Sequence, residues 1–533
     1  MRQRWIVFWT LLFLACYSYV LFRAWDHPET EILPLYALGS LSRLIFTYLI
    51  CLAFGLTVGI FAAMNKRAGD IIIPLLDILQ SVPVLGFFPF AIIIIVPVFG
   101  FVTASILLLF TSMAWSVVFG VIAGVKAIPQ HIQDMAAIFD IRGWAYVKNV
   151  VLPSVYGPLI AGSILAFGGG WYFLIASEYV SYGTHAYTLP GLGYYLNIAS
   201  FQYADIWMSL AGLFTIGLVV FLVHRLVWLR LDKNAREAKF LNLHFGYDRG
   251  VDLPKHHTAR ATHPHRRVHF NRRHSHQWFF NLFKFPTRTY VTWLFVIALI
   301  ILPAIYFTNQ SVDISIQELA ILLLRSFLRI LFAYVIAIII AVFIGYLLIR
   351  RPETRKVVMP LADVMQSIPA LAYFPIIYLV LSSFLPVDVT LEIASVLLLL
   401  TGMLWYLLFN VMEAVEHIPE DINEISRLYR LDGKVYVANI LVPAMFPALV
   451  TGSILAFGGG WNAIIVSEYV NIGGHVHSIP GIGSALDSVA GTTGNVATLL
   501  FMLFGMTTVV LLLNHFVWRK LLNHASKYVL EEE

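Results

Sequence analysis

Charged residues are scarce in this chain of 533 residues. Asp, Glu, Lys and Arg together make up 12% of it, whereas hydrophobic residues make up 59%. A soluble globular protein is about one quarter charged and about half apolar, so the composition excludes a soluble enzyme and a disordered chain. The abundance of Leu, Ile, Val and Phe instead indicates a polytopic membrane protein.

Cysteine and nucleotide-binding motifs are lacking as well. The two cysteines, Cys16 and Cys51, lie in apolar stretches, which excludes a disulfide framework. The glycine triplet at 168–170 is followed by Trp171 and not by Lys-Ser or Lys-Thr, so it lacks the lysine of a phosphate-binding loop. No hydrolytic or metal-ligand pattern is visible either. We therefore expect neither an enzyme nor a metal site.

The sequence contains a long internal repeat. Residues 162–171 recur unchanged at 452–461, and Glu-Tyr-Val at 178–180 recurs at 468–470, both at an offset of 290. Upstream the offset is 286 and relates Asp77, Gln80, Ser81 and Pro83 to Asp363, Gln366, Ser367 and Pro369. Such a collinear series predicts a tandem duplication, with a first half over 1–231, a linker over 232–288 and a second half over 289–533.

Each half contains about six apolar stretches that reach the ~20 residues of a membrane-spanning helix. They lie near 5–23, 43–64, 71–98, 104–125, 155–177 and 206–229, and near 290–307, 326–349, 357–381, 391–413, 445–467 and 496–519. The sequence thus predicts an all-α polytopic membrane protein with about twelve transmembrane helices. Because six is even, the two six-helix repeats would cross the membrane in parallel orientation.

Basic residues mark the cytoplasmic side of a membrane protein. Lys66, Arg67 and the loop over 126–148 fall on the same predicted side as the linker, whereas Asp26 and Glu29 fall on the other. This distribution predicts both termini and the linker in the cytoplasm. The linker is rich in His and Arg but matches no zinc spacing. We expect a solvated basic tether there, with a metal site or contact with anionic headgroups as alternatives.

The loop between the fourth and fifth spans contains a short amphipathic segment in both halves. Each copy opens with Ile-Pro, and proline is favoured at a helix start. Apolar or aromatic residues follow at helical spacing: Ile132, Met135, Ala136 and Phe139 in the first copy, and Ile422, Ile425 and Tyr429 in the second. Gly143 and Gly433 then allow a turn. Such a helix fits either the groove of a partner or the headgroup region of the bilayer.

These loops resemble the EAA motif of ABC importer permeases, the binding-protein-dependent transport inner-membrane components. The matched positions are Asp134, Met135, Ala136 and Pro153 in the first copy, and Glu424, Ile425, Ser426 and Pro443 in the second. Asp140 and Arg430 replace the motif glycine, although Gly143 and Gly433 follow three residues later. The resemblance covers both halves and implies a type-I importer permease fold with both pore halves in one chain.

The resemblance also implies partners. Each loop would provide a coupling helix to a cytoplasmic ABC ATPase, of which two copies are expected, and the partner would hydrolyse ATP while this chain binds no cofactor. An extracytoplasmic binding protein would deliver the substrate at a prokaryotic inner membrane, and no nucleic acid is involved. The Gln-Ser-Val-Pro segment at 80–83 and the Gly-Gly-Gly-Trp segment at 168–171 resemble the nitrate, sulfonate and taurine branch, which implies a small anion. An importer for an amino acid or a thiamine-like precursor, and an ion-coupled carrier, are the alternatives.

Polar and aromatic residues inside the apolar stretches are the candidates for a translocation pathway. Intramembrane carboxylates are costly and tend to face a cavity or a partner, and the prolines predict a kinked third helix. Structural alternatives are interhelical hydrogen bonds, tryptophan packing and solvated interfacial glutamates. The candidates are Asp77, Gln80, Ser81, Trp171 and Glu178, with Asp363, Gln366, Ser367, Trp461 and Glu468.

Two arginines and the glycine triplets need their own explanation. Arg43 and Arg329 begin the second apolar stretch of each half, where they either attract anions or anchor the helix by snorkelling. The glycine triplets lie inside apolar helices, where small residues let helices pack closely. We therefore expect packing or a hinge at the triplets, with ligand contact as the alternative.

Overall fold

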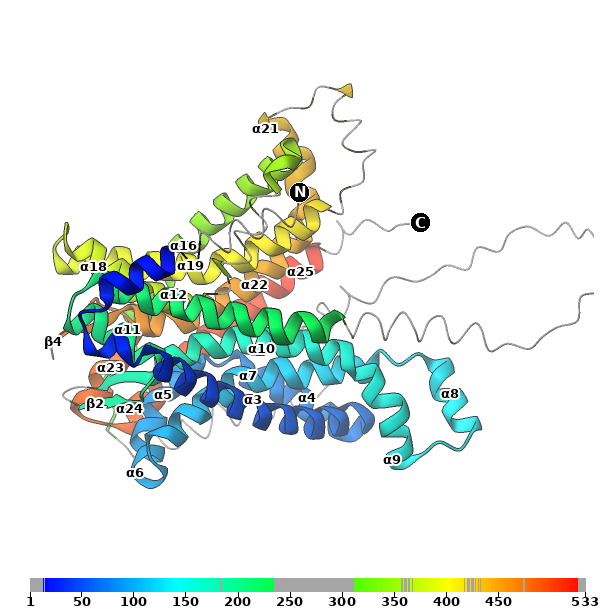
Figure 1. Cartoon of the computed structure of the whole chain (residues 1–533). Helices are drawn as coiled ribbons and strands as arrows, with labels where there is room; N and C mark the ends of the chain where they lie inside the picture. The colour runs from blue at the N-terminus through cyan, green and yellow to red at the C-terminus, as the bar shows by residue number, and fades with distance from the viewer. Residues whose placement is uncertain are drawn as a thin grey trace, which may run out of the picture.

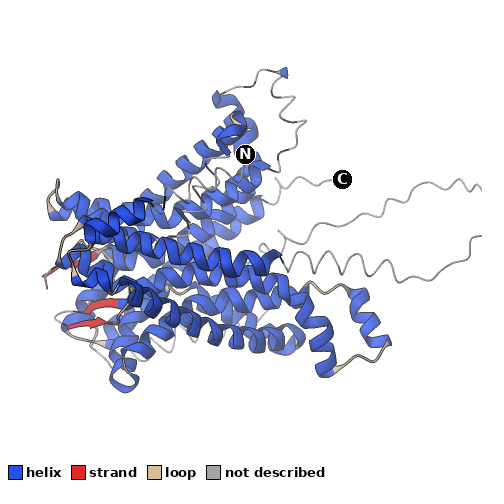
Figure 2. Ribbon diagram, in the orientation of Figure 1, coloured by secondary structure: helices blue, strands red, loops and turns tan. Residues whose placement is uncertain are grey.

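A computed structural model describes residues 13, 15–182, 185–233, 311–355, 358, 362, 365–366, 368–416, 418, 422, 426, 428–429, 431, 433–472 and 475–525. This part of the chain is helical apart from its loops and two short β-hairpins, which lie at the same end of the molecule (Figure 2). The helical fold class predicted from the sequence is therefore confirmed.

Long apolar helices form the body of both halves. Among the described residues, eight are long and apolar enough to cross a membrane: Leu33–Met64, Phe101–Lys126, Gly143–Glu178, Ile206–Lys233, Ile316–Arg350, Val387–Val415, Val437–Ser467 and Val496–Ala525. Val84–Phe99 and Ala370–Ser382 are shorter apolar stretches. The predicted span near 290–307 lies outside the described residues, and the one near 5–23 does so in part. The count of twelve therefore stays a prediction.

The first half runs through eighteen elements in chain order (Figure 1): α2 (Pro28–Glu31), α3 (Leu33–Met64), α4 (Lys66–Ser81), η1 (Val84–Phe87), α5 (Phe88–Phe90), η2 (Ala91–Ile95), α6 (Val96–Phe99), α7 (Phe101–Lys126), α8 (Gln130–Ile138), α9 (Gly143–Tyr146), η3 (Val147–Val151), α10 (Leu152–Glu178), β1 (Tyr179–Tyr182), β2 (His185–Thr188), α11 (Leu192–Asn197), η4 (Ile198–Gln202), α12 (Ile206–Val223) and η5 (His224–Trp228).

The second half repeats this order where it is described: α16 (Ile316–Arg350), η6 (Pro352–Thr354), α18 (Ala370–Ser382), α19 (Val387–Glu416), α21 (Gly433–Tyr436), η7 (Val437–Leu441), α22 (Val442–Ser467), β3 (Tyr469–Ile472), β4 (His475–Ser478), α23 (Ile482–Thr492), α24 (Val496–Leu513), η8 (Asn514–Trp518) and α25 (Arg519–Ala525). The antiparallel hairpins keep one register, with Tyr179 opposite Thr188 and Tyr469 opposite Ser478.

Small residues let the long helices of each half approach closely. Helix α7 packs against α3 and α10, and α19 packs against α16 and α22. A Cβ on Gly162 of α10 would lie 2.4 Å from the backbone oxygen of Ser116 in α7, so no larger residue fits there. The last glycine of the first triplet is also closely packed, because a Cβ on Gly170 would lie 2.7 Å from Leu44 Cδ1, whereas one on Gly460 would lie 3.1 Å from Met403 Sδ. The expectation of packing is confirmed at this position.

The predicted third span over 71–98 is not one helix. Helix α4 ends at Ser81, and after Pro83 the chain continues through short segments that end at Phe99. Proline removes a helical N–H and restricts the residue before it, so the predicted kink is a full break. The N–H of Val84 finds a new acceptor in the other half, where Asn462 Oδ1 of α22 lies 2.7 Å away.

The two ends of the molecule differ. The hairpins, α11 and α23 lie at one end, here called the hairpin end, and α5 and α18 lie beside them (Figure 1). Helices α8 and α9 project from the opposite end, the loop end, and α21 of the second half lies away from the hairpins at the top of the view, well apart from α8 and α9 (Figure 1). The halves contact each other toward the hairpin end, for instance through the rings of Phe201 and Tyr378, 5.7 Å apart.

Candidate functional site

A buried ion pair closes the hairpin end of the first half. Glu178, the fully buried last residue of α10, accepts hydrogen bonds from Ser40 Oγ at 2.6 Å and from the N–H of Gly193 at 2.7 Å. The guanidinium of Arg43 pairs with the same carboxylate and also donates to the carbonyl of Pro190 at 2.8 Å. We call this set the first clasp, because it fixes the loop that follows the hairpin onto α3.

The second half contains the same arrangement, the second clasp. Glu468 is fully buried, accepts from Ser326 Oγ and from the N–H of Gly483 at 2.7 Å, and pairs with Arg329 at 2.8 Å. Arg329 also donates to the carbonyl of Pro480 at 3.0 Å. The duplication therefore preserved not only residues but a complete hydrogen-bond network.

The clasps explain the Pro-Gly-x-Gly repeat. A Cβ on Gly191 would lie 2.3 Å from the carboxyl carbon of Glu178, and one on Gly481 would lie 2.2 Å from that of Glu468. Real Cβ atoms do not approach other atoms this closely. Glycine is therefore required at these positions because the loop backbone lies directly on the buried carboxylate.

The two clasps differ in one carboxylate. Arg329 also donates to Glu392 on α19, from Nε at 2.7 Å and from Nη2 at 2.6 Å. Arg43 Nε is buried and has no hydrogen-bond partner among the described residues. Val102 of α7 stands at the position that corresponds to Glu392, since both helices share the offset of 290 that relates Ser105–Ser177 to Ser395–Ser467.

The clasps correct three expectations from the sequence. Glu178 and Glu468 are not solvated interfacial carboxylates, because both are fully buried. Arg43 neither snorkels nor stands free to attract anions, since it neutralises Glu178, and Arg329 does the same for Glu468. A gap of 135 residues separates Arg43 from Glu178, so no local pattern could reveal the pairing.

The halves enclose a cavity of about 110 Å³ at the hairpin end. Phenol and amide groups from Tyr179, Asn197, Tyr469 and Asn471 lie among apolar lining residues such as Phe374, and the lining includes no Asp, Glu, Lys or Arg. Burial raises the pKa of the Tyr179 hydroxyl, and burial with the nearby Asp487 raises the pKa of Tyr469. Both phenols are therefore neutral hydrogen-bond donors at physiological pH.

The predicted pathway residues do not gather around this cavity. Trp171 and Trp461 are buried in the helix core, and the Trp461 indole stacks on Phe327 of the same half, so neither faces an open path in this conformation. Gln80 is partly buried and Gln366 is exposed. Asp77 and Ser81 lie in α4, but their side chains, like Asp363 and Ser367, lie outside the described part.

The predicted amphipathic helix of the first loop exists as α8, but its apolar stripe divides. Ile132 and Ala136 face inward, where Ile132 packs against the cluster formed by Val125 and Val155. Met135 and Phe139 face outward. The expectation of a single apolar face is wrong, because α8 is held against the spans by one edge and presents the other.

The outward edge is larger than the sequence suggested. Ile138 is 78% exposed and Phe139 is 72% exposed, and Trp144 of α9 is exposed beside them in sequence. Periodicity missed Ile138, which lies in α8 but off the spacing of the predicted stripe, and Trp144, which lies in the next helix, α9. Asp134, exposed on α8, accepts a hydrogen bond from Gln130 at 3.1 Å.

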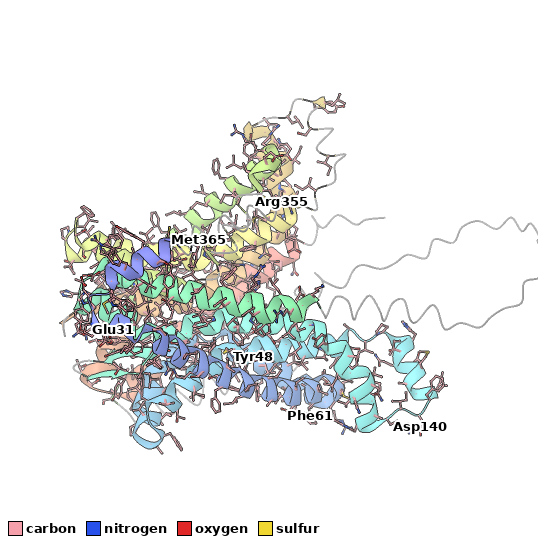
Figure 3. All side chains as sticks on the ribbon, viewed as in Figure 1. Glu31, Tyr48, Phe61, Asp140, Arg355 and Met365 are labelled. Atoms are coloured by element: carbon pink, nitrogen blue, oxygen red, sulfur yellow. The ribbon has the colours of Figure 1, made fainter. Side chains whose placement is uncertain are left out.

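A left-handed residue follows α8. Asp140 has φ +52° and stands where the motif has glycine, and Gly143 has φ +58°. Aspartate tolerates this region better than most residues, which explains how the motif glycine can be replaced here. Figure 3 shows Asp140 at the tip of the loop end, with Glu31 near the opposite end of the molecule.

The second loop follows the same plan where it is described. Leu428 and Tyr429 are exposed, Ile422 is partly buried, and Gly433 has φ +56°. Pro443 begins α22 as Pro153 begins α10. Glu424 and Ile425 lie outside the described residues. An extra contact holds this loop, because Arg350 at the end of α16 donates to the carbonyl of Leu431 at 3.2 Å.

Two similar helical halves that share a cavity, each with a projecting apolar loop, define a polytopic membrane permease duplicated within one chain. The chain belongs to the family of binding-protein-dependent transport system inner membrane components, whose sequence model matches residues 55–232 and 333–522. This is a family of transport proteins and not of enzymes, so the cavity is a candidate passage.

Several anion permeases are similar to this chain. The nitrate import permease protein NrtB of Synechococcus elongatus is 27% identical over 197 residues, which are 37% of this chain and 67% of that protein. The bicarbonate transport system permease protein CmpB of the same species is 29% identical over 160 residues, 30% and 53% of the two chains. The taurine transport system permease protein TauC of Escherichia coli is 27% identical over 186 residues, 35% and 64%. The matches thus span between about half and two thirds of these relatives.

Proposed function

We propose that this chain is the permease of an ATP-driven ABC importer, with both pore halves fused, and that it takes up a small anion. The observation that carries the proposal is the pair of loops at the loop end. Both present large apolar side chains at equivalent places, away from the long helices. Exposed apolar patches of this kind mark interaction surfaces.

The partner that fits these loops is a cytoplasmic ATPase subunit, one for each loop. Burying one large apolar side chain contributes about 1.5–3 kcal/mol, so Ile138, Phe139 and Trp144 together can anchor a helix in a groove. The partner hydrolyses ATP and this chain binds no cofactor. Closure of the ATPase pair moves the loops, and the halves then open and close alternately around the cavity between them.

Charge supports a cytoplasmic loop end in a prokaryotic inner membrane. Lys66 and Arg67 begin α4, Arg142 precedes α9, and Arg350 ends α16, all next to the projecting loops or at the same ends of the spans. Positive residues favour the cytoplasmic side. Both termini and the linker then lie inside, and an extracytoplasmic binding protein delivers substrate to the hairpin end.

The cavity supports a small solute. Its volume of about 110 Å³ is well below the roughly 300–1,000 Å³ of pockets for drug-sized ligands, which argues against a thiamine-like precursor. Neutral phenol and amide donors can replace part of the hydration shell of a singly charged anion without trapping it. The relatives named for nitrate, bicarbonate and taurine agree with this substrate class.

The first test is purification of the chain in mild detergent, with mass spectrometry of the proteins that accompany it. The variant carries Ile138→Arg with Phe139→Arg. Its matched control is Phe384→Arg, which changes an exposed aromatic residue beyond α18, near the hairpin end. We expect an ATPase with the native chain and the control, and less of it with the variant. An undiminished amount of ATPase with a folded variant refutes the docking surface, and none with the native chain refutes the importer.

A second test separates the importer from an ion-coupled carrier. Uptake of nitrate is measured in cells after the proton gradient has been collapsed while ATP is held constant. An importer continues to take up the anion, whereas a carrier stops. Competition by taurine, bicarbonate and an amino acid then defines the substrate class.

A further inference from the structure

One carboxyl group near the cavity has no hydrogen-bond or ion-pair partner in the part of the chain that the structure describes. Asp487 of α23 is 5% exposed, and its Oδ1 is buried without a hydrogen-bond partner among the described residues. Burying a charge without pairing costs far more than burying a neutral group. The clasps show how this chain treats carboxylates that it keeps ionised, because Glu178 and Glu468 each receive an arginine. Asp487 receives none.

The position of Asp487 is between the halves. Helix α23 packs against β1 and α5 of the first half, and against β3 of its own half. Tyr469 of β3 lines the cavity, and the negative charge of Asp487 acts on its phenol. Asp487 does not line the cavity itself, but it is close enough to Tyr469 for its charge to act on a phenol that does.

The first half has a neutral residue at the same place. The offset of 290 that relates Gly193 to Gly483 also relates Asn197 to Asp487, and Asn197 lines the cavity. Asparagine and aspartic acid have nearly the same shape, and the protonated acid, like the amide, is a neutral donor and acceptor. Asn197 lines the cavity and Asp487 does not, but the two equivalent positions carry the same charge when Asp487 is protonated and differ by one negative charge when it is ionised.

Among the described residues, no cation on the elements packed against α23 is free to hold Asp487 ionised. Glu468 directly follows α22, and α16 contributes Arg329, which is already shared between Glu468 and Glu392, together with the exposed Glu318 and Arg325. Strands β3 and β1 contribute the phenols of Tyr469 and Tyr179. Helices α24 and α5 contain no titratable residue. Burial raises the pKa of Asp487 to about 7, so both forms are populated near neutral pH.

We propose that Asp487 is a proton-sensitive selectivity residue of the cavity between the halves, which admits a small anion when protonated and repels it when ionised. The inference rests on the proposed function, because an anion must cross this cavity. The direction of the pH dependence follows from the negative charge that Asp487 gains when it loses its proton. Uptake is full below the pKa and falls as pH rises through about 7, by at most about tenfold per pH unit for one titrating group.

The test exchanges the two equivalent residues. The variants are Asp487→Asn, Asn197→Asp and the double exchange, each reconstituted in liposomes with the ATPase and binding protein. Uptake of nitrate and of methanesulfonate is measured between pH 5.5 and 8.5, because both remain singly charged throughout. Asp487→Asn should flatten the pH profile, Asn197→Asp should steepen it, and the exchange should restore the dependence. A native-like fall in uptake with pH in Asp487→Asn overturns the proposal.

A second readout needs no transport. Infrared difference spectra of the purified chain report the carbonyl stretch of protonated carboxyl groups. We expect a band that titrates near pH 7 and is missing in Asp487→Asn, and its absence from the native chain overturns the proposal. Failure of the two proposals gives different results. If the importer proposal is wrong, there is no ATP-dependent uptake at any pH. If only the proposal for Asp487 is wrong, uptake is intact, but the infrared band or the change in the pH profile is missing.

Discussion

Neutralising Glu178 should destabilise the protein more than neutralising Glu468, although the two glutamates occupy equivalent places. The change is Glu→Gln in each half, which keeps the shape and removes the charge. In the first clasp, Arg43 then has no carboxylate partner among the described residues and keeps the carbonyl of Pro190. In the second, Arg329 retains both hydrogen bonds to Glu392 as well as the carbonyl of Pro480.

The magnitude follows from burial. Removing one partner of a buried ion pair costs about 3–5 kcal/mol, because the other charge stays buried and unpaired. The Arg43 side chain is 15% exposed, which favours the lower end of that range, ~3 kcal/mol. Each charge-assisted hydrogen bond contributes about 1.5–3 kcal/mol when buried. The side chain of Glu392 is 47% exposed, so we expect it to reduce the cost in the second clasp by about 1 kcal/mol.

The assay is thermal unfolding of the purified chain in detergent, for Glu178→Gln, Glu468→Gln and two further variants. Glu392→Val added to Glu468→Gln should bring the loss up to that of Glu178→Gln, because it recreates the first clasp. Val102→Glu added to Glu178→Gln should recover part of the loss, because it gives Arg43 Nε a carboxylate. Equal losses in the two single variants, or no recovery from Val102→Glu, would refute the reasoning.

Two further predictions concern single residues. Asp140→Gly should leave stability equal or raise it by up to about 1 kcal/mol, because glycine adopts φ +52° without strain and the exposed pair with Arg142 contributes little; a clear loss in thermal unfolding would contradict this. Asn462→Ala should cost about 1–3 kcal/mol by leaving the N–H of Val84 unsatisfied, whereas Tyr172→Phe, which removes a buried hydroxyl that has no partner among the described residues, should cost nothing in the same assay.

The sequence predicted those features that depend on composition and repetition. Apolar stretches of spanning length, the duplication and the break at Pro83 follow from solvation, from identity at a fixed offset and from the chemistry of proline. The amphipathic helix α8 was predicted at the right place, but the face that it presents was not. Which edge of α8 is exposed depends on how Ile132 packs against α7 and α10, and that packing is tertiary.

The clasps could not be predicted for a related reason. Arg43 and Glu178 are 135 residues apart, and each has its own plausible explanation at a membrane surface. Only the fold shows that they neutralise each other. The repeat of Pro-Gly-x-Gly was a usable signal, because the same glycine spacing in both copies indicates that the backbone closely approaches another group. The sequence does not show that this group is a carboxylate.

Fusion of the two halves explains where they differ. The clasps lie within each half and their core of Arg, Glu, Ser and glycine is the same twice, whereas residues between the halves diverge: Asn462 corresponds to Tyr172, and Asp487 to Asn197. In a permease built from two identical subunits, an acid at this place would face a second copy across the axis, and like charges raise each other's pKa. A single chain can carry one acid near the cavity and a neutral amide at the equivalent position. The binding or loss of one proton then changes the charge near the cavity.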